Sequence, residues 1–217
     1  MGSGKGQARR TQRIAPQEET DEGVAILCVD GTREWRLDGR ASRLSRRDGP
    51  AVIREDGMKE WWLMGVRYRE HDLPTIEYLD GTQAWCVGGD ENGSLVYHRY
   101  DGPAIIRSSG DQEWYLNGVR HREDGPAVET RGGHKSWLQN GHLHREVGPA
   151  VEYEDGKREW YQKGKQHRED GPAVVNIDGS EEWWIAGHEA TEEEVRKIVR
   201  FKLLEKSVLD FPERNTF

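Results

Sequence analysis

The stretch DGPAIIRSSGDQEW, residues 101–114, decides the fold because variants of it recur along the chain. Three copies precede it and three follow: EGVAILCVDGTREW (22–35), DGPAVIREDGMKEW (48–61), DLPTIEYLDGTQAW (72–85), DGPAVETRGGHKSW (124–137), VGPAVEYEDGKREW (147–160) and DGPAVVNIDGSEEW (170–183). From Trp114 to Trp183 the closing tryptophans are 23 residues apart. Self-similarity at a fixed period is the signature of a repeat architecture.

One spacing inside the repeat does not vary. The distance from the proline, or from Val24 in the first copy, to the closing tryptophan is always 11 residues. The distance from a tryptophan to the next proline varies between 12 and 18 residues. A fixed segment joined by variable ones is typical of a structural unit connected by loops.

The fixed segment reads as a β-hairpin with a two-residue turn at its centre. Asp-Gly stands there in five copies, and that dipeptide favours a type I′ turn. Such a turn would place each closing tryptophan opposite a Val or Ile, and these pairs would form the structural core. The predicted core residues are Trp35, Trp61, Trp85, Trp114, Trp137, Trp160, Trp183, Ile26, Val52, Ile76, Ile105, Val128, Val151 and Val174.

The residue after the tryptophan is often aromatic, and this register places it on the opposite face. That pattern predicts an outward stripe of partner-binding residues: Trp62, Tyr115, Tyr161 and Trp184. The connector that follows Trp85 is longer than the others and contains Asp90, Glu91 and Asn92. Loops on rigid scaffolds often carry binding specificity, so this connector is a second candidate, against neutral variation in a connector.

The frame EW-Y-x-N-G-x-x-H-R-E-D-G-P-A-V-x-x-x-D-G, for example Trp114 to Gly133, resembles MORN repeats. It departs from them consistently, because Arg-Glu-Asp-Gly-Pro-Ala stands where the standard unit has Gly-x-Gly. This is similar to variants met in bacterial, tailed-phage and giant-virus proteins. The resemblance implies a mainly β chain, an elongated single-layer antiparallel sheet of seven hairpins over residues 21–187.

Both ends differ from the array. Residues 1–20 form a basic tail with no apolar pattern, which predicts disorder, as a linker or as a basic binding arm. Residues 188–217 predict a C-terminal capping helix from about Glu192 to Ser207, begun by Thr191 and Glu194 as a capping box. Val195, Ile198, Val199 and Leu203 would cover the last hairpin. Phe201, Leu204 and Val208 would either fold under the sheet with the Phe211 tail or bind a partner, including a second copy in a homodimer.

The charge and the motifs argue against several classes of function. The net charge is −8, and residues 18–217 carry −12 once the four basic residues of the tail are removed. Nucleic-acid and membrane binding are therefore disfavoured. Cys28 and Cys86 are not in a metal-ligand spacing, so reduced thiols and a cytoplasmic location are expected. We expect no metal and no cofactor.

The repeated His-Arg pairs have the residue types of acid–base catalysis. A catalytic site is not normally made in four copies, so we expect ladders of ion pairs with neighbouring glutamates. Mild acid would then charge the histidines together and loosen the array.

The sequence favours a non-enzymatic protein-binding scaffold. By analogy with viral members of the resembling group, it would occupy a host protein complex, such as a bacterial defence complex. The alternatives are a MORN-type scaffold associated with membrane lipid, and an enzyme with a site between the sheet and the C-terminal helix.

Overall fold

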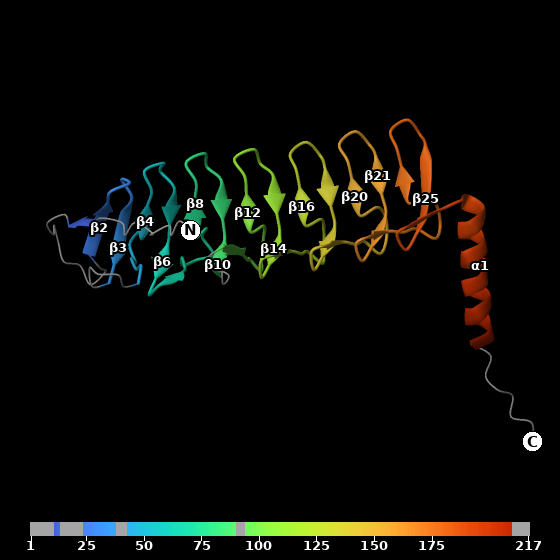
Figure 1. Cartoon of the computed structure of the whole chain (residues 1–217), viewed down its shortest axis with the longest axis horizontal. Helices are drawn as coiled ribbons and strands as arrows, with labels where there is room; N and C mark the ends of the chain where they lie inside the picture. The colour runs from blue at the N-terminus through green and yellow to red at the C-terminus, as the bar shows by residue number, and fades with distance from the viewer. Residues whose placement is uncertain (1–10, 14–23, 38–42, 90–93, 210–217) are drawn as a thin grey trace, which may run out of the picture. The chain divides into compact units, whose positions relative to one another are not determined.

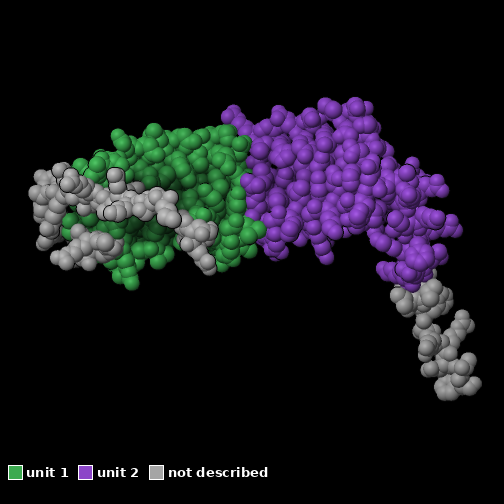
Figure 2. Space-filling model, in the orientation of Figure 1, with its two compact units in different colours: residues 1–119 green, residues 120–217 purple. Residues whose placement is uncertain are grey.

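The structure is a computed structural model that describes residues 11–13, 24–37, 43–89 and 94–209. It is mainly β, with an antiparallel sheet built from successive hairpins and one C-terminal helix (Figure 1). The predicted fold class is confirmed in these terms. The chain divides into two compact units, Met1–Val119 and Arg120–Phe217 (Figure 2), whereas the sequence predicted boundaries at the two ends of the repeat array.

Each unit combines main-sheet strands with short side hairpins that follow the tryptophans (Figure 1). The main-sheet strands of the first unit are, in order, β1 (Thr11–Arg13), β2 (Val24–Cys28), β3 (Arg33–Arg36), β4 (Val52–Ile53), β5 (Lys59–Glu60), β8 (Ile76–Glu77), β9 (Gln83–Ala84), β12 (Ile105–Ile106) and β13 (Gln112–Glu113). Its side-hairpin strands are β6 (Trp62–Leu63), β7 (Val66–Arg67), β10 (Cys86–Gly89), β11 (Leu95–Tyr97) and β14 (Tyr115–Leu116). The next strand, β15 (Val119–Arg120), crosses the boundary between the units in sequence.

The second unit repeats the pattern and adds the helix. Its main-sheet strands are β16 (Val128–Glu129), β17 (Lys135–Ser136), β20 (Val151–Glu152), β21 (Arg158–Glu159), β24 (Val174–Val175), β25 (Glu181–Ile185) and β26 (His188–Ala190). Its side hairpins pair β18 (Leu138–Gln139) with β19 (His142–Leu143), and β22 (Tyr161–Gln162) with β23 (Lys165–Gln166). The helix α1 spans Glu192–Leu209.

The Asp-Gly turn differs from the prediction. The N–H of Arg54 donates to the carbonyl of Met58, so the loop has three residues, 55–57, and ends on Gly57 at φ 84°. This is a type I turn closed by a left-handed glycine, the usual three-residue hairpin loop. The Asp56 carboxylate accepts the N–H of Met58 and favours this geometry. The type I′ prediction is therefore wrong.

The extra loop residue shifts the register by one. Val52 pairs with Glu60 instead of Trp61, and Ile26 pairs with Glu34 instead of Trp35. The closing tryptophan faces the small residue, as Trp35 faces Ala25. A one-residue slip moves side chains to the other face, so the predicted Val–Trp core face does not exist.

Two faces with different contents result. One face carries Val or Ile together with the acidic residue before the tryptophan. The other face carries the tryptophans and alanines, of which Ala51, Ala104, Ala127, Ala150 and Ala173 are fully buried. Among the predicted core residues, Trp61, Trp85, Ile26, Val52, Ile76, Ile105, Val151 and Val174 are buried, while Trp35, Trp114, Trp137, Trp160, Trp183 and Val128 are half-buried.

Type I′ geometry is found in the side hairpins. Trp62 pairs with Arg67 and Leu63 with Val66, which leaves a two-residue loop of Met64 and Gly65. Both loop residues have positive φ, 53° and 83°. The equivalent non-glycine residues Asn117, Asn140, Lys163 and Ala186 also have positive φ.

The two termini differ in how far they match the prediction. The sequence predicts disorder for residues 1–20, but Thr11–Arg13 form β1 and pair with β2; the rest of that tail lies outside the described residues. The capping box is confirmed, because the N–H of Glu194 donates to the Thr191 hydroxyl and the N–H of Thr191 donates to the Glu194 carboxylate. Val195 is fully buried, which anchors α1 to the second unit.

Candidate binding surface

In the His-Arg pairs at 98–99, 144–145 and 167–168, the arginine lies over the preceding tryptophan. The guanidinium of Arg168 is 4.1 Å from the centre of the Trp160 ring, and one of its N–H groups donates to the carbonyl of Pro172. The same stack forms between Arg69 and Trp61, Arg99 and Trp85, and Arg145 and Trp137. Such contacts stabilise a fold by about 0.5–2 kcal/mol each.

The glycine of the Gly-Pro-Ala motif leaves space for this arginine. A Cβ on Gly171 would lie 2.7 Å from the Arg168 guanidinium carbon, closer than real Cβ contacts allow. The alanine that follows the proline is fully buried in five copies. The motif therefore leaves the space in which the arginine lies over the tryptophan.

The histidine of each pair accepts a hydrogen bond from the next repeat. Nδ1 of His98, His121, His144 and His167 accepts the backbone N–H of Asn117, Asn140, Lys163 and Ala186, respectively, 19 residues further on. The donating residue is the left-handed residue of the next side hairpin. We expected His-Arg ladders with neighbouring glutamates, but the histidine's main bond is to backbone. The arginines do pair with acids, as Arg145 does with Glu152.

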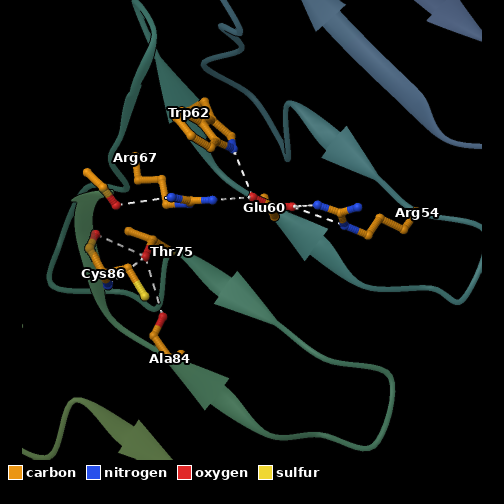
Figure 3. Close-up of polar contacts among 8 residues, drawn as sticks. Arg54, Glu60, Trp62, Arg67, Thr75, Ala84 and Cys86 are labelled. Atoms are coloured by element: carbon orange, nitrogen blue, oxygen red, sulfur yellow. Dashed lines mark hydrogen bonds and ion pairs between the residues drawn. The ribbon is translucent and has the colours of Figure 1, made fainter. Parts of the chain in front are cut away.

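The predicted aromatic stripe shares a face with the buried glutamates. Figure 3 shows that the Glu60 carboxylate accepts hydrogen bonds from the guanidinium groups of Arg54 and Arg67 and from Nε1 of Trp62. The Trp62 bond is 3.2 Å long. The hydroxyls of Tyr115 and Tyr161 donate to Glu113 and Glu159, and Nε1 of Trp184 donates to Glu182. All four aromatic side chains are half-buried. They therefore stabilise this face, and their role in partner binding stays a prediction.

The irregular connector begins at a buried cysteine. The Cys86 N–H donates to the Thr75 hydroxyl at 2.9 Å (Figure 3). Arg67 donates to the carbonyl of Gly88. Burial raises the pKa of the Cys86 thiol to about 12. The thiol is thus protonated at neutral pH. The candidate residues Asp90, Glu91 and Asn92 lie outside the described residues.

An apolar groove that the sequence did not predict opens beside the second hairpin. It has a volume of 980 Å³, and its apolar side chains are Leu63, Met64, Val66, Tyr68 and Leu73, next to the buried Trp61. Its charged rim contains Arg46, Arg47, Asp48, Arg69, Glu70 and His71. Met64 and Val66 are 55% and 57% exposed, and with Tyr68 and Leu73 they gather four exposed large apolar side chains at one groove.

The same groove in the sixth repeat is smaller and polar. It measures 490 Å³ and is lined by Arg145, Glu146, Val147, Gly148, Trp160, Gln162, His167, Arg168, Glu169 and Asp170. Leu63 corresponds to Gln162, and Tyr68 corresponds to His167. Alignment of the seven copies, position by position, was the signal that could have found the groove.

A strained bend borders the groove. His71 and Asp72 both have positive φ, 60° and 52°, which costs non-glycine residues free energy. The next repeat holds the bend, because Nε1 of Trp85 donates to the carbonyl of Asp72 and Arg99 pairs with its carboxylate at 2.7 Å. Leu73, which follows the bend, lines the groove.

The residues of the two predicted apolar stripes of α1 are buried to different degrees. Val195 is buried and Val199 is half-buried, but Ile198 and Leu203 of the same stripe are exposed, which contradicts full coverage of the last hairpin. On the second stripe, Phe201 and Leu204 are 62% and 56% exposed. The side chain of Val208, like the Phe211 tail, lies outside the described residues.

No protein-family model matches this chain, and no curated protein matches it in sequence. Among the residues that the structure describes, no group of three or more His, Cys, Asp or Glu side chains could hold a metal ion. No helix within the described ranges is long and apolar enough to cross a membrane.

Proposed function

We propose that this chain is a non-enzymatic repeat scaffold that binds protein through its apolar groove. The observation that carries the proposal is the apolar set Leu63, Met64, Val66 and Tyr68 in the second repeat, where the sixth repeat has Gln162, Lys163, Lys165 and His167. Leu63 and Val66 recur as Leu116 and Val119 in the fourth repeat, and Met64 and Tyr68 set the second repeat apart from it. A contiguous exposed apolar patch with a charged rim is typical of a protein interaction site.

The acid–base residues of the array support a scaffold over an enzyme. The His-Arg motif residues make the same structural contacts in successive repeats, as described for His167 and Arg168. Side chains that form hydrogen bonds with the backbone, ring stacks and ion pairs stabilise the scaffold on which the groove lies. Following the resemblance to viral MORN-like variants, we propose a cytoplasmic role in which the groove occupies a host protein complex.

A repeat-swap variant tests the groove. It carries Leu63→Gln, Met64→Lys, Val66→Lys and Tyr68→His, the residues found at 162, 163, 165 and 167. Because the array already accommodates these residues, the variant should fold. We expect immobilised wild-type chain to retain specific proteins from a natural host lysate, and the swap variant to lose them.

A matched control carries Leu116→Gln and Val119→Lys, equivalent polar changes in another side hairpin. It should retain the same proteins as the wild type. If the swap variant binds the same proteins with equal yield, the groove is not the binding surface and the proposal fails.

A further inference from the structure

The outward face of α1 is apolar with basic flanks. Phe201 and Leu204 are three residues apart and exposed, so they lie on one helix face. Lys197 and Arg200 flank them on the same side, opposite the buried Val195. This face is therefore a basic amphipathic surface that projects away from the hairpin on which the helix is anchored.

The second unit shows how a lysine of α1 meets the rim of a groove. Lys202 forms an ion pair with Glu169, and Glu169 lines the polar groove of the sixth repeat. Glu70 occupies the position of Glu169 at the apolar groove. It is exposed, and the nitrogen of His71 near it is 3.8 Å away. A basic helix residue is thus the natural partner of this rim position.

We propose that the apolar groove of one chain takes α1 of a second copy. Phe201 and Leu204 would lie against Val66, Tyr68 and Leu73, and Lys197 or Arg200 would pair with Glu70. Both patches are exposed and apolar. The rim carries Arg46, Arg47 and Arg69 as well as two carboxylates, so charge complementarity is confined to the local pairing of Glu70 with a basic helix residue, as Lys202 pairs with Glu169. The interface joins two different surfaces, so it is heterologous. The inference rests on the groove as a binding surface and names one occupant.

Sedimentation velocity of the purified full chain over a concentration series tests self-association. We expect the mean mass of the wild type to rise with concentration. The repeat-swap groove variant and the helix variant Phe201→Ser/Leu204→Ser should each remain monomeric, with unchanged circular dichroism.

Mixing the two variants distinguishes this interface from a helix–helix dimer. The groove variant retains an intact helix, and the helix variant retains an intact groove. An equimolar mixture should therefore form one-to-one heterodimers, whereas a helix–helix dimer predicts no heterodimer. In addition, Glu70→Lys should weaken association by about tenfold, the effect of a 1.4 kcal/mol loss. Lys197→Glu/Arg200→Glu in the partner should restore it.

A wild type that stays monomeric at every concentration overturns the proposal, as does a variant mixture that stays monomeric. Groove-dependent capture of a different protein by that monomer would leave the proposed scaffold function standing. A wild type that self-associates but captures no host protein would refute the scaffold function and leave this inference intact.

Discussion

At the residue scale, the arginine–tryptophan stack explains why the Gly-Pro-Ala motif begins with glycine. Gly171 and Gly49 both lie beside their repeat's arginine without a positive φ, so space is the reason for glycine at these positions. A Cβ would approach the arginine more closely at Gly171 (2.7 Å) than at Gly49 (3.1 Å).

We therefore expect Gly171→Ala to displace Arg168 from Trp160 and to lower the free energy of unfolding by about 1–3 kcal/mol. Gly49→Ala should cost less. Urea unfolding followed by tryptophan fluorescence measures both. Equal losses would contradict a steric origin that depends on the distance to the arginine.

The Cys86 thiol gives a prediction about pH. Its pKa is raised to about 12 by burial, while an unfolded cysteine ionises near pH 8.5. The folded chain binds more protons at this group between those values. Stability is thus complete below about pH 8.5 and falls as pH rises toward 12, by up to about 1.4 kcal/mol per pH unit.

A Cys28→Ser variant isolates Cys86 for measurement. Its thiol should react with a thiol reagent at pH 8 far more slowly when folded than in denaturant, because the thiolate is the reactive form. Rapid labelling of the folded variant would contradict both the burial and the raised pKa.

At the element scale, the side-hairpin turns hold residues of unequal suitability. Asn117 and Asn140 suit the positive φ of a type I′ turn, whereas Lys163 and Ala186 do not. Ala186→Asn should therefore raise the free energy of unfolding by about 0.5–1 kcal/mol, and Asn140→Ala should lower it by a similar amount. Thermal melting compares the two variants with wild type. Stabilisation by Asn140→Ala would refute the assignment of these turns.

The elements also show what the sequence could predict. The invariant 11-residue spacing to the tryptophan predicted hairpins correctly, because the number of residues in a unit fixes its strands. The register was predicted one residue off, because Asp-Gly ends both a type I′ turn and a type I turn closed by glycine. The Asp56 carboxylate decides between them by accepting the Met58 N–H, a contact invisible to residue counting.

At the scale of the whole molecule, the groove was not predicted because it is recognised only when equivalent positions of different repeats are compared. Each of Leu63, Val66 and Tyr68 is unremarkable alone. The tertiary proximity of Leu73, brought in by the strained bend at His71 and Asp72, completes the groove. The alternation of faces predicted Trp62 and Tyr115 as binding residues, and the structure shows them bonded to the buried Glu60 and Glu113.

Stability in a repeat array is set by neighbours, so damage at one end should stay local. Val195 is fully buried where α1 meets the last hairpin, and Val195→Asp places a charge there. We expect a loss of about 2–4 kcal/mol confined to the second unit. Hydrogen exchange should show faster exchange in β24–β26, while β2–β5 keep wild-type protection. In an array whose stability is set by neighbouring repeats, the loss of the last contact affects only the adjoining repeats. Faster exchange throughout the first unit would contradict this and would mean that the two units unfold as one.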